Sequence, residues 1–540
     1  MKNILGACLL LIFAACGARK EVDSIFLNGK IYTVDSAFNV VQAMAVQDGK
    51  IIATGTNEQI NQQYQSKNKV DLNGQFVYPG FYDAHCHFYG YGIDQKKINL
   101  TATTSFENLV DTLIKYRDKK FSGWIYGRGW DQNDWSEKKF PTREKLDSLF
   151  PDVPVLLIRV DGHAALCNQK ALTLANITAS TKIPGGEIIT TNGQPTGLLI
   201  DNAVDIVKAK VPKPSRADQI AALITAQENC FAVGLTSIAD AGLDRSEIEL
   251  IDSLQKEGKI KMRCYTMISY TPDNAAYYFK KGKIKTDYLN VRSFKVYADG
   301  ALGSRGACLS HDYADLPGHR GFLLTSVSDM QDAANQIYKN GFQMNTHCIG
   351  DSANHLLLQL YKKAFGNDKQ TRWRIEHAQV LQPGDISEFG KLGIIPSVQP
   401  THATSDMYWA DERLGNERLK TAYAYHELLL SYGLVACGSD FPVESINPLF
   451  GFYAAVVRKD QQGFPQQGFQ TENKLSREQA LRGMTIWAAY AAFEENEKGS
   501  IEKGKFADFV ITRQDLLTAP DSILYQVAID RVYSNGIKVY

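Results

Sequence analysis

The sequence has no excess of charge of either sign. Its 540 residues include 59 Lys and Arg against 59 Asp and Glu, which gives a formal net charge of zero at pH 7. Proteins that bind nucleic acid or other polyanions normally carry a basic excess. We therefore expect no nucleic-acid partner. The hydrophobic content of 44% is that of an ordinary globular protein with a large core.

Long apolar runs are absent beyond the N-terminus, so no later segment is expected to cross a membrane. Residues 1–3, with Lys2, form a short basic region, and residues 4–15 form an apolar run that ends just before Cys16. This pattern is typical of a signal peptide, and residues 1–16 are similar to a lipoprotein signal with its cleavage box. The sequence thus predicts an exported bacterial lipoprotein, periplasmic or on the cell surface. Its membrane association would come only from a lipid on Cys16. A plain signal peptide is the alternative, because Phe13 is not the usual residue three positions before such a cysteine.

Paired cysteines are also missing. Nine cysteines are scattered along the chain without a Cys-x-x-Cys spacing, and loss of the signal with lipidation of Cys16 would leave an odd seven. A disulfide framework normally needs an even number at regular spacings. We expect most of these cysteines to be buried as small apolar residues.

The two chain ends have the same character. Residues 23–78 contain short strand-like runs with turn pairs such as Asn28-Gly29 and Asp48-Gly49, and residues 498–540 return to this pattern. We predict that both ends pair into one small β domain.

The middle of the chain, residues 79–497, alternates short apolar runs with longer helix-like stretches. This alternation predicts βα units around a parallel sheet. Residues about 120–230 are too long for a single connection and are expected to form an insertion that takes one or two of the strands. The candidate strands are 76–84, 155–160, 233–238, 261–268, 292–298, 342–347, 372–377, 393–398 and 433–439.

The strongest chemical pattern is His85-Cys86-His87 at the end of an extended apolar run. On a strand the spacing i, i+2 places both imidazoles on one face and Cys86 on the other. Two imidazoles on one rigid strand are a good beginning for a divalent metal site.

Four further potential metal ligands are associated with strand-like runs. Lys295 lies within one run, and His347 and His377 end two more. Asp440 lies at a strand-to-turn boundary. Alone, such a histidine is usually a hydrogen-bonded core residue, and such an aspartate a turn residue. Their joint occurrence in an α/β pattern favours one site, because the active sites of parallel barrels gather at the carboxyl ends of the strands.

With these residues in place, nearly the whole mature chain resembles the metal-dependent amidohydrolase superfamily, amidohydrolase family 3. Three inner stretches are similar to the branch that contains N-substituted formamide deformylase. The stretches that carry the resemblance are 79–87 and 504–510 for the superfamily, and 161–168, 295–305 and 347–351 for the branch.

The resemblance implies a (β/α)8 TIM-type barrel over residues 79–497 and a small β-sandwich domain from residues 23–78 and 498–540. It also implies that His85, His87 and Asp440 bind a first metal ion and that His347 and His377 bind a second. Lys295 falls at the fourth-strand position where many relatives carry a carboxylated lysine that bridges two ions. An ion-paired lysine, with a single metal ion, is the alternative. Zinc suits imidazole and oxygen ligands, and iron, manganese or nickel could serve.

The chemistry expected of such a centre is hydrolysis of a non-peptide C–N bond, of the amide type, by a metal-bound hydroxide. Asp440 would take a proton from the hydroxide and pass it to the leaving nitrogen. The partner is then a small-molecule amide, and the sequence leaves a homo-oligomer open.

Four further residues are tentative substrate contacts. His163 and His402 follow strand-like runs, and each is equally well a structural histidine. Arg305 could anchor a carboxylate or form a surface pair. Trp130, with Trp135, could wall an apolar pocket or belong to a core.

Other functions stay open on the same fold, namely a deaminase, a lactonase or a cyclic-amide hydrolase. A third class is a non-catalytic surface binding protein. The joint presence of the six potential ligands argues against that class, because a binding module does not need the whole set.

Overall fold

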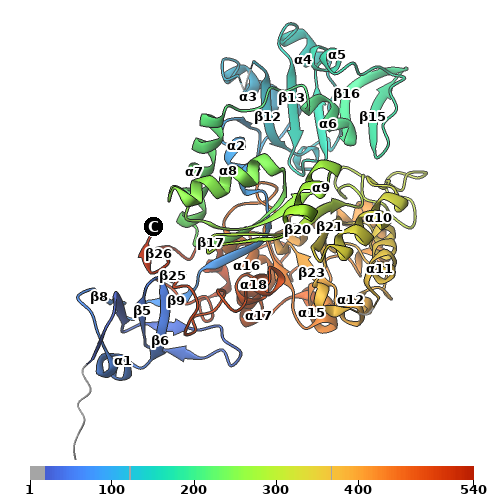
Figure 1. The fold of residues 1–540 in the computed structure, drawn as a ribbon. Coiled ribbons are helices and arrows are strands. Elements are labelled where there is room, and N and C mark those ends of the chain that lie inside the picture. Colours follow the sequence, from blue (N-terminus) through green and yellow to red (C-terminus); the bar gives the residue numbers. More distant parts are fainter. Residues whose placement is uncertain (1–18, 121–122, 367) are drawn as a thin grey trace, which may run out of the picture.

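The computed structural model describes residues 19–120, 123–366 and 368–540 (Figure 1). The predicted signal peptide and Cys16 lie outside the described residues. Within the described ranges, no helix is long and apolar enough to cross a membrane.

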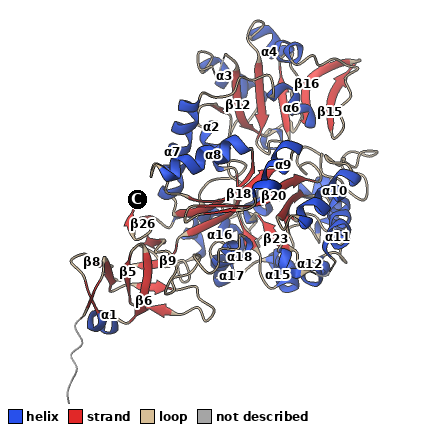
Figure 2. Ribbon diagram, viewed as in Figure 1, coloured by secondary structure: helices blue, strands red, loops and turns tan. Residues whose placement is uncertain are grey.

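The central unit is a nearly closed barrel of eight parallel strands (Figures 1 and 2). A short strand, β19 (Ile284–Lys285), adds to β20 in the antiparallel sense. The strands follow the order of the chain: β10 (Phe81–Cys86), β17 (Leu235–Leu243), β18 (Arg263–Ser269), β20 (Leu289–Tyr297), β21 (Gln343–Cys348), β22 (Arg374–His377), β23 (Ile395–Val398) and β24 (Ala436–Cys437). Each overlaps a predicted strand, and Lys295 lies in the fourth.

Helices follow the strands and surround the sheet, as the alternating pattern predicts (Figure 2). They bury their apolar faces in one large core cluster together with the outward side chains of the barrel. The main ones are α7 (Arg216–Ala232), α8 (Arg245–Lys256), α9 (Pro272–Lys281), α10 (Val327–Lys339), α11 (Asp351–Phe365), α12 (Ile386–Leu392), α15 (Tyr425–Tyr432), α16 (Pro448–Val457), α17 (Arg477–Gly483) and α18 (Ile486–Ala491).

The last strand reaches the first through backbone contacts at the carboxyl end of the barrel. The Asp440 amide donates to the carbonyl of His85 at 2.7 Å. A carboxylate from β10, Asp83, accepts hydrogen bonds from the amide and the hydroxyl of Ser439 at 3.0 and 2.6 Å. These contacts hold the loop after β24 against the end of β10.

An insert unit lies between β10 and β17, at the top of Figure 1. Its six-stranded sheet has the order β11 (Ile98–Asn99), β12 (Ile125–Trp130), β13 (Val155–Arg159), β14 (Ala164–Cys167), β16 (Gln194–Asp201) and β15 (Gly186–Thr191). It carries α3 (Phe106–Lys115), α4 (Glu144–Leu149), α5 (Gln169–Leu174) and α6 (Asn202–Lys208).

The insertion predicted at about 120–230 overlaps this unit but has different bounds. The sheet begins already at Ile98. The prediction missed this start because β11 is only two residues long and gives no strand signal in the sequence. At the other end, α7 belongs with the barrel and packs against α2 (Phe88–Asp94), where a Cβ atom at Gly92 would overlap the carbonyl of Ala222. The predicted strand 155–160 is β13 of the insert.

Both chain ends share a six-stranded sheet at the lower left of Figure 1. Its centre is β9 (Phe76–Pro79), which pairs with β25 (Phe509–Thr512) in antiparallel and with β3 (Lys30–Tyr32) in parallel fashion. The outer strands are β4 (Val40–Val41), β26 (Ile529–Ser534) and β27 (Ile537–Lys538). The predicted pairing of the two ends is therefore observed.

A second sheet of this region comes from the N-terminal end alone. Its order is β6 (Lys50–Gly55), β5 (Ala43–Gln47), β2 (Ser24–Leu27) and β8 (Lys69–Asp71). Side chains of both sheets, among them Phe26, Met44, Val77 and Phe509, form one buried cluster.

Candidate metal centre

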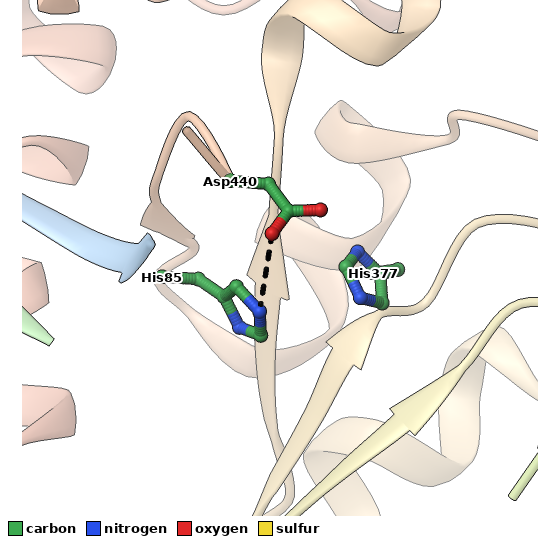
Figure 3. Close-up of side chains that lie close together, drawn as sticks. All are labelled: His85, His377 and Asp440. Carbon is green, nitrogen blue, oxygen red and sulfur yellow. Dashed lines mark ion pairs between the residues drawn. The ribbon is translucent and has the colours of Figure 1, made fainter. Parts of the chain in front are cut away.

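Three buried side chains from different barrel strands meet at the carboxyl end of the barrel. The potential ligand atoms of His85, His377 and Asp440 all lie within 4.8 Å of one another (Figure 3). His85 is the penultimate residue of β10, His377 ends β22, and Asp440 follows β24. The fold thus brings residues that are more than 350 positions apart in the sequence into one cluster.

The hydrogen bonds of three histidines fix the same tautomer. His85 Nδ1 lies 2.5 Å from Glu376 Oε2, His87 Nδ1 lies 3.0 Å from the carbonyl of Ala241, and His377 Nδ1 lies 2.7 Å from Gln399 Oε1. Each partner is an acceptor, so each Nδ1 carries the hydrogen. Each neutral ring then offers a lone pair on Nε2, which is the atom a metal ion would use.

These lone pairs converge on a carboxylate. Asp440 Oδ1 lies 3.1 Å from His87 Nε2 and 3.5 Å from His85 Nε2. The same oxygen is buried and has no hydrogen-bond partner among the described residues. Acceptor atoms that face one another in a buried place repel unless a cation lies between them. The donor set therefore fits a divalent metal ion.

Burial keeps the histidines neutral. The pKa of His85 falls to about 4, because burial and the nearby Lys295 ammonium disfavour the imidazolium. The pKa of His377 also lies well below the usual value, with burial as the main cause. Neutral imidazoles at pH 7 are the form that ligates metals.

His347 lies beside this cluster. Its ring centroid is 4.6 Å from that of His377. Its Nε2 faces the carbonyl of Gly300 at 3.5 Å, which leaves Nδ1 as the nitrogen free for a ligand. Burial and the neighbouring His377 lower its pKa well below the usual range. The structure thus brings together all five predicted histidine and aspartate ligands.

Lys295 points into the same place from β20. Its Nζ lies 3.1 Å from His85 Nε2, and its side chain is buried. No carboxylate of the described residues forms an ion pair with it, although the charges of Glu376 and Asp440 act on its amine. Burial lowers the pKa of Lys295 to about 8, so the reactive neutral amine is more populated than in an exposed lysine.

Sequence reasoning missed the residues that hold the ligands. Glu376 accepts from His85 and forms a buried ion pair with Arg374, whose Nε lies 2.7 Å from Glu376 Oε1. Both side chains are completely buried. The available signal was a charged pair at i, i+2 inside the apolar strand that ends in His377. Gln399 gave no signal.

Two of the tentative substrate contacts lie at the centre. The ring of His163, from the insert unit, is 4.9 Å from that of His347, and His402 Nε2 lies 3.8 Å from Asp440 Oδ2. The sequence left both at even weight between contact and structural roles.

The other two tentative contacts are engaged elsewhere. Arg305 pairs with Asp315 at 2.6 Å. Trp130 is completely buried in a core cluster of the insert unit, and its indole N–H donates to the carbonyl of Leu157 at 2.8 Å. A completely buried ring offers no surface to a substrate, so Trp130 has the core role that was its alternative. Cys86 lies in the barrel core, as strand alternation predicts.

Known proteins are similar to this chain in sequence and in fold. The family model described as "Amidohydrolase family" matches residues 69–540. The protein named "Putative amidohydrolase YtcJ" of Bacillus subtilis (strain 168) is 31% identical over 96% of this chain and 99% of its own. N-substituted formamide deformylase of Arthrobacter pascens is 26% identical over 96% of this chain and 98% of its own.

A solved structure agrees with the sequence matches. The uncharacterized metal-dependent hydrolase from Pyrococcus horikoshii OT3 has a TM-score of 0.75 and 25% identity, and the match covers 92% of this chain and 99% of that one. The barrel, the cluster of candidate ligands at its strand ends and these similarities agree. The chain belongs to the amidohydrolase family and is a hydrolase.

Proposed function

We propose that this protein is a metal-dependent hydrolase that cleaves a non-peptide C–N bond of the amide type, releasing an amine from an acyl or formyl group. One observation carries the proposal. The Nε2 lone pairs of His85 and His87 face a buried Asp440 oxygen that has no hydrogen-bond partner among the described residues, at the catalytic end of a barrel. The similarity to N-substituted formamide deformylase supports the bond type.

His85, His87 and Asp440 would hold a first ion, and His347 and His377 a second. Zinc is the ion that best suits this set of imidazole and oxygen ligands. A carboxylated Lys295 would bridge the two ions, since its buried amine lies 3.1 Å from His85 Nε2 and forms no ion pair with a carboxylate of the described residues. Bound divalent ions supply a water nucleophile at neutral pH and polarise the scissile carbonyl.

The protein's own groups then handle the proton. Asp440 is the only carboxylate of the described residues in the group that could hold a metal. It is placed by Asp83 through Ser439 and by its own amide, which donates to the His85 carbonyl. We assign to Asp440 the transfer of a proton from the attacking water to the leaving nitrogen.

Three further features belong to the proposal. The two sheets of the chain ends form the β-sandwich domain, supported by their shared buried cluster. The chain is exported and anchored through Cys16, on the strength of residues 1–16. The substrate is a small molecule, as the name of one relative, N-substituted formamide deformylase, suggests.

A metal-loaded panel tests the proposal. The mature protein is loaded with Zn²⁺ and offered N-substituted formamides and acetamides, with lactones, cyclic amides and aminopurines as the competing classes. Release of an amine that stops with a chelator and returns with Zn²⁺ is the expected result. Turnover confined to a competing class, or a protein that binds no divalent ion, would overturn it.

A further inference from the structure

The insert unit places a histidine beside the candidate metal centre. This histidine is not one of the predicted metal ligands, all of which come from the barrel. His163 lies between β13 and β14 of the insert, and its ring stands 4.9 Å from that of His347 on β21. The two ring planes are inclined by 33°.

Asp201 orients this ring. His163 Nδ1 lies 2.6 Å from Asp201 Oδ1, and the Asp201 amide donates to the His163 carbonyl at 2.7 Å. The two residues therefore extend the antiparallel ladder of β14 and β16 by one rung, beyond the pair Ala164 and Ile200. A pair held by both backbone and side chain has little freedom to rotate.

The position of Asp201 is itself strained and enclosed. Its φ is +50° with ψ −125°, a conformation that a residue other than glycine adopts only when its surroundings impose it. Its side chain is completely buried. A Cβ atom at Gly300 or at Gly306 would overlap its carboxylate, so the barrel loop after β20 forms a glycine seat for it.

The other ring nitrogen of His163, Nε2, is unpaired within the part of the chain that the structure describes. No described residue makes a hydrogen bond or ion pair with its Nε2, and 17% of the side chain is exposed. With Nδ1 held by Asp201, Nε2 is the polar atom that the ring presents beside His347. This is the arrangement of His85, His87 and His377, whose Nδ1 atoms are likewise each bound to an acceptor while Nε2 faces the centre.

We propose that His163 contacts the substrate through Nε2, on the His347 side of the centre, and that Asp201 is the positioning residue that aims it. The inference rests on the proposed function for the nature of the substrate, an amide whose acyl group or nitrogen lies next to His347. It makes the insert unit a determinant of which substrates are accepted.

The test uses the Zn²⁺-loaded full mature chain and four variants: His163→Gln, Asp201→Asn, the double variant, and Gly306→Ala, which crowds Asp201 without removing a polar group. His355→Gln is the matched control. His355 also donates Nδ1 to an aspartate, Asp385 at 2.9 Å, but it is half exposed on α11. Metal content, the unfolding temperature, kcat and KM for the best amide of the panel, and the Kd for acetohydroxamate are measured for each.

We expect His163→Gln to lower kcat/KM and the affinity for acetohydroxamate by about tenfold to a hundredfold, the range for one buried hydrogen bond. Metal content and unfolding temperature stay at the wild-type level. Asp201→Asn and Gly306→Ala give losses of the same kind, and the double variant is no worse than His163→Gln, because both residues act through one contact. His355→Gln matches the wild type.

Equal kcat/KM and equal acetohydroxamate affinity for His163→Gln and wild type would overturn the inference while leaving the proposed function intact. Loss of metal from His163→Gln would also overturn it, since His163 would then be a ligand. Additive losses in the double variant would remove Asp201 from its positioning role. If no amide is hydrolysed, the proposed function fails, and the acetohydroxamate titration alone decides the role of His163.

Discussion

Glu376→Gln tests how the centre is supported. Glu376 touches no substrate, yet its Oε2 receives the Nδ1 hydrogen of His85 at 2.5 Å, and its Oε1 lies 2.7 Å from Arg374 Nε. All three side chains are completely buried. The substitution keeps the size of the side chain and removes its charge.

Two losses of different origin follow. A hydrogen bond from a metal-binding histidine to a carboxylate is worth 10- to 100-fold in metal affinity, or about 1.4 to 2.7 kcal/mol. Removing one partner of a buried ion pair leaves Arg374 uncompensated and costs about 3–5 kcal/mol of folding free energy. We therefore expect weaker Zn²⁺ binding together with a lower unfolding temperature of the metal-free protein.

Chelator competition measures the Zn²⁺ affinity, and calorimetry of the metal-free protein measures stability. The matched control is Glu388→Gln on α12, where Glu388 pairs with Lys391 at 2.7 Å on the surface. Such exposed pairs contribute about 0–1 kcal/mol, so this variant should match the wild type in both assays. Wild-type Zn²⁺ affinity in Glu376→Gln would refute the support assigned to this carboxylate.

Three further predictions concern catalysis, the bridging lysine and pH. Asp440→Asn should lower kcat by about 100- to 10,000-fold with metal retained, because the proton carrier is lost; near-normal turnover would exclude that role. Lys295→Ala should bind fewer divalent ions per chain, and added acetate, which can replace a carbamate, should restore part of the metal content; unchanged stoichiometry would argue for a single ion or an unmodified amine. Burial raises the pKa of Asp240 to about 8, so the folded state retains a proton that the unfolded state releases near pH 4. The stabilisation from Asp240 is thus complete below about pH 4 and is lost as the pH rises towards 8. Asp240→Asn should flatten this dependence of the unfolding temperature, whereas an unchanged slope would assign it to other groups.

The barrel was predictable because its strands are short apolar runs between helices. Eight of the nine predicted runs supply a barrel strand. The run 76–84 divides at Gly80, with β9 in the end sheet and β10 in the barrel. A Cβ atom at Gly80 would overlap Thr236, so the chain changes sheets where it has no side chain. Apolar pattern alone does not reveal such a change, which depends on a contact with a distant strand.

The clustering of the candidate ligands was predictable for a related reason. His85, His347 and His377 stand at strand ends, and parallel strands bring their ends together. The groups that support these histidines could not be predicted. Glu376, Gln399 and the glycines that enclose Asp201 acquire their roles only through contacts across the fold. Arg305 and Trp130 were ambiguous in sequence, and neighbouring residues decided their roles.

The most direct test of the metal centre is anomalous diffraction at the zinc edge from a crystal of the Zn²⁺-loaded protein. We predict a peak about 2.0–2.1 Å from Nε2 of His85 and of His87 and next to Asp440. A second peak should lie by His347 and His377, with the carbamate of Lys295 between the two. The absence of any peak among these side chains would contradict the account.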